Sequence, residues 1–292
     1  MPAFSSSIRA RVCVQIMALA VLSFAQADAR AEPAAAAAAP VPAAPNLAAG
    51  CKFETLGTGT VRRVIDGRTF HLDDGQQVRL AAIEVPPLPL PGESGAPAKA
   101  GLAAKTTLES IIGGRSVTLK TLGPNADRYG RILAYVFLQD QDRSVQQTML
   151  AQGQARVAGD VGASTCANLL LADERAARAA GLGLWADPYF GIQRAENPSK
   201  VLAERGKFTL VEGKVLSVRE SRGTIYVNFG RRWSEDFTVT VLKRNERAFS
   251  GAGLELKKLS GRRIRVRGFV EERGGPWIEA TRPEQIELAE QN

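Results

Sequence analysis

Residues 61–87, VRRVIDGRTFHLDDGQQVRLAAIEVPP, carry the pattern that decides the fold. Apolar residues recur on both sides of Asp74-Gly75, a dipeptide typical of tight hairpin turns. The stretch is therefore predicted to form a strand, a turn and a second strand. On a curled sheet, that arrangement brings together the charged side chains of Asp66, Arg68, Arg79 and Glu84.

A second stretch, DRYGRILAYVF at 127–137, repeats the pattern of a turn followed by a strand. Tyr129-Gly130 is a turn signal, and the β-rich run after it would carry Arg131 at the start of a strand. Arginines and acids from the two stretches then converge. Such a cluster is what phosphodiester chemistry requires.

These two stretches resemble the signatures of the staphylococcal nuclease (thermonuclease) family. The second signature, Asp-x-Tyr-Gly-Arg-x-Leu-Ala, is matched at every position from Asp127 to Ala134. The first, Asp-Gly-Asp-Thr, Arg-Leu and Ile-Asp-x-Pro-Glu, is matched in frame with three departures. Residues 144–157 and 169–187 resemble the family's two C-terminal helices, so the likeness covers about 55–190. It implies an α+β fold built on a five-stranded OB-type barrel.

The resemblance also implies a site in which calcium bridges two Asp side chains and the phosphate, a Glu activates water and two Arg stabilise charge. Arg79 and Arg131 match the two arginines, and Glu84 stands at the second metal-binding position. Arg68, however, occupies the first metal-ligand position, and Pro87 occupies that of the general base. Because Arg68 puts a fixed positive charge where a dication would sit, no metal cofactor is expected.

We expect the Arg68 guanidinium to replace the metal by bridging Asp66 and Glu84, which leaves Arg79 and Arg131 to clamp a phosphate. The protein would then bind nucleic acid or another phosphodiester polyanion with weak or absent hydrolysis. A simpler interpretation makes the two arginines structural, paired with carboxylates of their own barrel.

Two other functions remain open. In the first, Glu93 of the proline-rich loop 86–98 acts as a substitute base, and Ca²⁺ or another ion, held by Glu84 and Asp66, restores hydrolysis. The chain would then be an active phosphodiesterase or endonuclease with an altered metal site. In the second, the protein is a periplasmic scaffold that binds an unidentified protein partner.

The N-terminal region has the composition of a secretory leader. Residues 1–31 contain Arg9 and Arg11, then an apolar run, then the pattern Ala29-Arg30-Ala31. This layout predicts a cleaved signal peptide and a periplasmic or secreted protein with no stable membrane span. An Ala/Pro-rich tether, predicted to be disordered, follows at 32–50. Because the mature chain keeps Cys51 and Cys166 in an oxidising compartment, one disulfide between them is expected; two buried free thiols are the alternative.

The predicted domains are a thermonuclease-like domain at 51–190, a linker at 191–206 around Asn197-Pro198, and a basic domain at 207–292. In the last, three strand patterns, a helical stretch and two more strand patterns follow the order of a second OB-like barrel. Its basic character is marked, since residues 197–292 hold 19 Lys and Arg against 13 Asp and Glu, compared with 16 against 15 in residues 51–196.

Aromatic and basic residues interleave in this second barrel, as in proteins that bind single-stranded nucleic acid. The alternative is that the aromatics fill the core and the cations face water. The candidate nucleic-acid-binding residues are Tyr226, Arg231, Arg232, Trp233, Arg265 and Arg267.

Overall fold

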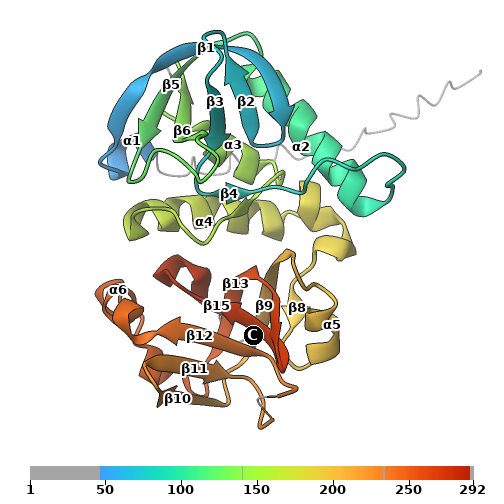
Figure 1. The fold of residues 1–292 in the computed structure, drawn as a ribbon, viewed down its shortest axis with the longest axis vertical. Coiled ribbons are helices and arrows are strands. Elements are labelled where there is room, and N and C mark those ends of the chain that lie inside the picture. The colour runs from blue at the N-terminus through green and yellow to red at the C-terminus, as the bar shows by residue number, and fades with distance from the viewer. Residues whose placement is uncertain (1–46, 140, 233, 290–292) are drawn as a thin grey trace, which may run out of the picture. The chain divides into compact units, whose positions relative to one another are not determined.

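Five strands in the first part of the chain form a closed barrel with the order β1-β2-β3-β6-β5 (Figure 1). The computed structural model describes residues 47–139, 141–232 and 234–289. Only β3 and β6 pair in parallel; the other neighbours are antiparallel. The barrel strands are β1 (Glu54–Asp66), β2 (Thr69–Leu72), β3 (Gln77–Leu80), β5 (Ser116–Thr121) and β6 (Ile132–Leu138).

The two predicted turns are present. Gly75 and Gly130 have φ angles of 86° and 77°, in the left-handed region that glycine adopts without a Cβ clash. After β3 the chain turns out of the barrel at Ala82, whose φ is 65°. It continues as β4 (Ile83–Glu84), which pairs antiparallel with β7 (Arg156–Val157).

Three helices cover the barrel: α2 (Ala96–Ile112), α3 (Val145–Ala151) and α4 (Ser164–Ala179). The first carries a proline in its first turn, where the missing N–H leaves no hydrogen bond unmade. The predicted disulfide is confirmed, since Cys51 and Cys166 are bonded with their Cα atoms 5.8 Å apart. It ties the entry of the barrel to the first turn of α4.

The start of this region lies inside the predicted tether. Residues 47–50 form a short helix, α1 (Leu47–Gly50), and Leu47 is fully buried against the barrel core. The predicted disorder is therefore wrong for these four residues. The predicted signal peptide and the rest of the tether lie outside the described residues.

The second part of the chain repeats the OB topology around a separate apolar core. Two hydrogen-bonded sheets have the orders β10-β11-β12-β15-β14 and β16-β13-β9-β8. The pairs β9/β10 and β13/β14 are each one stretch of chain that bends from one sheet into the other. Counted as single strands, they give the neighbour order of the first barrel, including one parallel pair, β12 with β15. The predicted second OB-like barrel is confirmed in this form.

The elements of this part are β8 (Gln193–Arg194), α5 (Pro198–Leu202), β9 (Phe208–Lys214), β10 (Ser217–Ser221), β11 (Thr224–Asn228), β12 (Thr238–Leu242), α6 (Glu246–Gly251), β13 (Arg263–Phe269), β14 (Glu271–Arg273), β15 (Gly275–Glu279) and β16 (Ile286–Leu288). Single turns of 3-10 helix lie at Gly183–Ala186, Pro188–Phe190, Lys243–Asn245, Leu256–Leu259 and Pro283–Gln285.

The segment predicted as a linker, 191–206, is structured. It holds β8, which pairs in parallel with β9, and α5, which starts at Pro198. A proline at the first helical position starts a helix as readily as it ends one, so Asn197-Pro198 marks a helix start here. Among the described residues, no helix combines the length and apolar character needed to cross a bilayer.

Candidate phosphate-binding site

Glu84 lies at the centre of the predicted site, held by two arginines. The Arg68 guanidinium is hydrogen-bonded to the Glu84 carboxylate, and Arg79 Nη2 lies 3.7 Å from its other oxygen, Oε1. All three side chains are about one fifth exposed. The carboxylate is thus flanked by two cations at the edge of the barrel, where β2, β3 and β4 bring them together.

Asp66 plays a different part from the one predicted. Its Oδ1 accepts a hydrogen bond of 2.8 Å from the backbone N–H of Arg68, two residues further on. This is the turn geometry that aspartate favours between two paired strands. The predicted guanidinium bridge is therefore only half correct: the Arg68 side chain binds Glu84, whereas Asp66 binds the Arg68 backbone.

Arg131 is oriented by Asp127. Its Nε and Nη2 lie 2.7 Å and 2.6 Å from Asp127 Oδ2, while Asp127 Oδ1 accepts backbone N–H groups of the turn. Burial raises the pKa of Asp127, but the hydrogen bond from Arg131 and those from the backbone outweigh it and hold the pKa below its usual value. The ring of Tyr129, 67% exposed, lies 5.2 Å from the Arg131 guanidinium.

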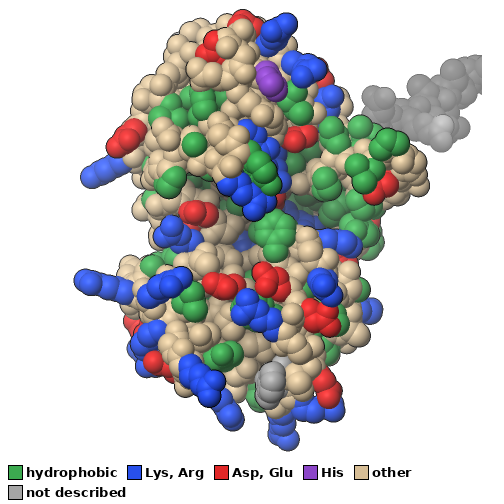
Figure 2. Space-filling model, in the orientation of Figure 1, with side chains coloured by type: hydrophobic (Ala, Val, Ile, Leu, Met, Phe, Trp, Pro, Cys, Tyr) green, Lys and Arg blue, Asp and Glu red, His purple; other side chains and the backbone are tan. Residues whose placement is uncertain are grey.

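The three arginines repel one another across this edge of the barrel. The pKa of Arg79 is lowered, first by burial and then by Arg68, with a smaller contribution from Arg131, while Glu84 opposes the shift. Lys and Arg side chains gather on this face near β4 (Figure 2). An anion bound among the guanidinium groups would relieve their repulsion. Arg79 and Arg131 therefore each have a carboxylate neighbour, as in the structural interpretation, and Arg131 is near enough to Arg79 to contribute to lowering its pKa.

Calcium does not fit this set of donors. Ca²⁺ takes six to eight oxygen ligands, mostly anionic. The candidate carboxylates are Glu84, which already pairs with two arginines, and Asp66, whose Oδ1 holds a turn. A dication beside Arg68 would face electrostatic repulsion of more than about 4 kcal/mol, because each of its two unit charges at 4 Å contributes about that much at an effective dielectric of 20. Pro87, at the position of the family's base, has no group that accepts a proton.

Glu93, the predicted substitute base, lies on the same hollow as Arg68 and Glu84. Its Oε2 accepts the backbone N–H of Leu90 at 2.8 Å, which orders a turn in the exposed proline-rich loop. The loop therefore brings a carboxylate to the neighbourhood of the arginines without placing it in any ion pair among the described residues.

On the second barrel, Tyr226 and Arg231 line a hollow of about 820 Å³ on the outward face of β11, β12 and β15. Arg219, directly opposite Tyr226 in the strand register, and Arg273, whose guanidinium lies 3.2 Å from the centre of the Trp277 ring, line the same hollow. Neither of these two arginines is among the candidates predicted from the sequence. The alternation of β10 against β11 would have identified Arg219, because it shares the face of Tyr226.

Of the other predicted nucleic-acid-binding residues, three lie outside this hollow, and the fourth is not among the described residues. Arg232 is exposed and pairs with Glu235. Arg265 is on β13, in the other sheet, and pairs with Glu212 at 2.6 Å. Trp233 is not among the described residues.

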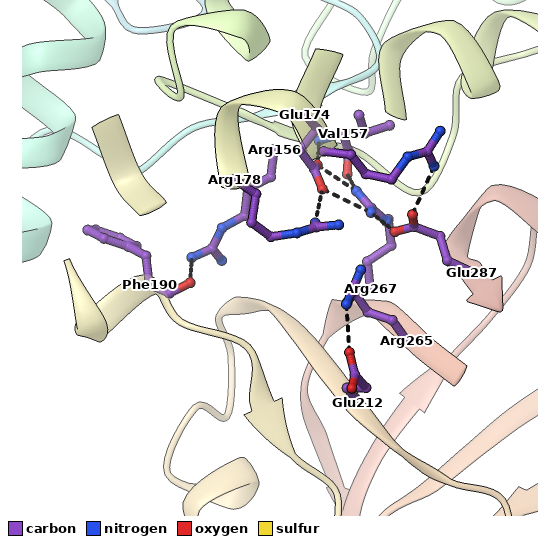
Figure 3. A network of polar contacts seen from close by, with 10 residues as sticks. Arg156, Val157, Glu174, Arg178, Phe190, Glu212, Arg265, Arg267 and Glu287 are labelled. Carbon is purple, nitrogen blue, oxygen red and sulfur yellow. Dashed lines mark hydrogen bonds and ion pairs between the residues drawn. The ribbon is translucent and has the colours of Figure 1, made fainter. Parts of the chain in front are cut away.

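The prediction for Arg267 is wrong, because this side chain is 1% exposed. It lies within a network of polar contacts (Figure 3). Its guanidinium binds Glu174 of α4 at 2.7 Å and 3.1 Å, Glu287 of β16, and the carbonyl oxygen of Val157 at 3.1 Å. Arg178 also pairs with Glu174, at 3.0 Å. Both terminal nitrogens of Arg267 are therefore occupied, and the side chain joins β13 to α4, β7 and β16.

Comparisons with known proteins agree with this geometry. A family model described as staphylococcal nuclease homologue matches residues 77–187. Over 142 residues the chain is 30% identical to endonuclease YncB and 30% identical to the SPbeta prophage-derived endonuclease YokF, both of Bacillus subtilis (strain 168). The match covers 47% of this chain, 66% of YncB and 47% of YokF, so it spans about two thirds of one relative and about half of the other. The chain therefore contains a domain of the staphylococcal nuclease family.

Proposed function

We propose that this protein binds nucleic acid or another phosphodiester polyanion at the arginine site, with weak or absent hydrolysis. The observation that carries the proposal is the pairing of Glu84 with both Arg68 and Arg79. A carboxylate neutralised in this way is a poor metal ligand, whereas the surrounding guanidinium groups suit a phosphodiester. The substitution of proline for the base at position 87 removes the second requirement of hydrolysis.

The second barrel supplies a further contact for a long polyanion in this proposal. Its outward hollow combines the ring of Tyr226 with Arg219 and Arg231, which have no ion-pair partner among the described residues. Aromatic rings beside unpaired cations suit a single strand, whose bases stack while its phosphates bind.

We further propose that the protein acts outside the cytoplasm, periplasmic or secreted, after cleavage of the leader at 1–31. The Cys51–Cys166 disulfide supports this location, because structural disulfides persist in oxidising compartments. Mass spectrometry of the mature protein from a periplasmic or culture-medium fraction tests it: an N-terminus near residue 32 is expected, and a cytoplasmic full-length chain would refute it.

The test of binding uses a fluorescein-labelled single-stranded oligonucleotide and anisotropy measured across a series of salt concentrations. The Arg79→Ala/Arg131→Ala variant should weaken binding and reduce the slope of log K against log salt by about 1.4, because each phosphate contact on a single strand contributes about 0.7. The control, Arg62→Ala/Arg63→Ala, removes two exposed arginines of β1 that have no ion pair among the described residues. Equal slopes for the two variants would refute the site, and salt-independent binding or none at all would favour a protein-binding scaffold.

An active nuclease is the second candidate, favoured by Glu93 on the same hollow as Arg68 and Glu84. The same oligonucleotide is incubated with calcium, magnesium, manganese or EDTA. The binding proposal expects intact substrate in every reaction. Metal-dependent cleavage that Glu93→Gln abolishes would replace that proposal with hydrolysis through a substitute base.

A further inference from the structure

A pocket of about 590 Å³ opens directly beside the arginine site. Arg68 and Glu84 form part of its wall, so the pocket and the candidate phosphate site are continuous. The rest of the wall comes from the proline-rich loop, from η2 (Pro188–Phe190) and from the beginning of β9. We call this space the aromatic pocket, after the four rings that line it: Tyr189, Phe190, Phe208 and Phe269.

The rings stand in two pairs. Phe208 and Phe269 meet edge to face with ring centroids 5.5 Å apart, and Tyr189 and Phe190 do so at 5.0 Å. Phe269 is 52% exposed and Tyr189 is 40% exposed, so both leave apolar surface in contact with water at the pocket. Large exposed rings that converge on one hollow are typical of a binding site.

Arg156 links these rings to the arginine site. It stands opposite Glu84 in the pairing of β4 with β7. Its side chain donates to the carbonyl oxygen of Phe208 at 2.8 Å. It also donates to that of Phe190 at 3.0 Å (Figure 3). The structure thus couples the position of each aromatic wall to the strand that carries Glu84, and Arg156 acts as a positioning residue.

Two cations of the pocket wall, Arg156 and Lys207, already have partners within the protein. Burial lowers the pKa of Arg156 to about 10, which leaves it protonated at neutral pH, but both of its terminal nitrogens bind carbonyl groups. Lys207 pairs with Glu204 at 3.2 Å and donates to the Tyr189 hydroxyl at 3.0 Å. A second phosphate would have to displace these partners, whereas a flat apolar ligand would not.

We propose that the aromatic pocket receives one unpaired nucleobase of the strand whose phosphodiester lies at Arg79 and Arg131. This rests on the proposed function and deepens it. The volume lies within the range of small-molecule sites, and exposed aromatic faces stack bases of any sequence. A base held in a duplex cannot leave its partner without losing pairing and stacking energy. The pocket therefore makes the protein selective for single strands.

The experiment compares three 5′-fluorescein-labelled probes by anisotropy: a ten-residue thymidine oligonucleotide, a set of the same oligonucleotides carrying one abasic site at each position in turn, and a duplex. Wild-type protein should bind the duplex less tightly, and one abasic position should weaken binding by roughly 5- to 150-fold, the range measured for loss of a stacked base. Phe269→Ala and Tyr189→Ala should weaken binding of the intact strand within the same range. In Phe269→Ala, the abasic site at that sensitive position should weaken binding little further, because the ring that stacks on the missing base is already absent.

Leu102→Ala, on α2, is the control, because it removes a side chain of similar exposure, 51%, outside the aromatic pocket. Thermal unfolding of every variant checks that the fold is kept. Wild-type affinity in Phe269→Ala and Tyr189→Ala, or an abasic penalty as large in Phe269→Ala as in wild type, would overturn the pocket assignment. If Arg79→Ala/Arg131→Ala binds normally while Phe269→Ala does not, the phosphate site fails and the pocket stands.

Discussion

Arg267→Met is the most informative test of how the two barrels are held. Methionine keeps an unbranched apolar stem like that of arginine and has a similar volume, so the change removes the buried charge with little change in volume. It leaves the carboxylates of Glu174, 0% exposed, and Glu287, 9% exposed, without their shared partner. Breaking a buried ion pair in this way typically costs about 3–5 kcal/mol.

The contacts that remain set the size of the effect within that range. Glu174 keeps Arg178 at 3.0 Å and the backbone N–H of Val157 at 2.6 Å, and Glu287 keeps the half-exposed Arg175 at 3.2 Å. We therefore expect a loss near the lower end, about 3 kcal/mol. For a unit of this size, that corresponds to a fall in Tm of roughly 6–12 °C.

The assay is urea unfolding followed by far-UV circular dichroism and by tryptophan fluorescence. The control is Arg205→Met, which breaks the exposed pair with Glu272 and should cost under about 1 kcal/mol. A second substitution, Glu174→Gln, removes one stranded charge and should restore part of the loss in Arg267→Met. A loss in Arg267→Met no larger than in the control, or no restoration by Glu174→Gln, would refute the role assigned to this network.

Three further predictions concern covalent linkage, pH and packing. Reduction of the Cys51–Cys166 disulfide, which spans 115 residues, should lower the free energy of unfolding by about 4–5 kcal/mol in the chain-entropy model. The measurement is the shift in the urea midpoint between samples with and without reductant, and an unchanged midpoint would contradict the prediction. Although burial raises the pKa of Glu287, attraction to the buried arginine outweighs it and holds the pKa below the usual value of 4.5. The stabilisation by this carboxylate is therefore complete above about pH 4.5 and is lost as the pH falls through the lowered pKa. Over that pH range the urea midpoint should drop in wild type, and it should drop less in Arg267→Met. Gly101→Ala would put a Cβ 2.1 Å from the backbone carbonyl oxygen of Pro87, so the free energy of unfolding should fall by roughly 1–3 kcal/mol. The control, Gly251→Ala, places its Cβ in open space and should leave stability nearly unchanged.

The local sequence pattern was sufficient to predict the two barrels. The turns at Gly75 and Gly130 each depend on two or three neighbouring residues, and so do the alternations that bury Ile225 and Val227 fully. The disulfide followed from a count of the two cysteines that remain if the chain is exported as predicted. In each case the deciding interaction, or the chemical constraint, is visible within the sequence itself.

Burial by distant segments was not predictable in the same way. Alternation in β13 puts Ile264 and Val266 in the core and therefore puts Arg267 on the outward face, where solvent is the default. What covers it is Glu174, 93 residues earlier in the chain. Periodicity gives the face on which a side chain lies, but not what packs against that face. The same limit hid Arg156, whose partners are backbone carbonyl groups that have no sequence signature.

The disulfide between Cys51 and Cys166 makes the first barrel a covalent ring. Asp66, Arg68 and Glu84 lie inside that ring, as does the whole proline-rich loop, whose residues 90–95 are exposed. A protease that cuts this loop therefore opens the ring without releasing a fragment, since the two pieces stay joined through the sulfur atoms. The nicked protein would run as one band on a non-reducing gel and as two after reduction. The disulfide would keep the two pieces that carry the arginine site covalently linked even after the main chain is cut.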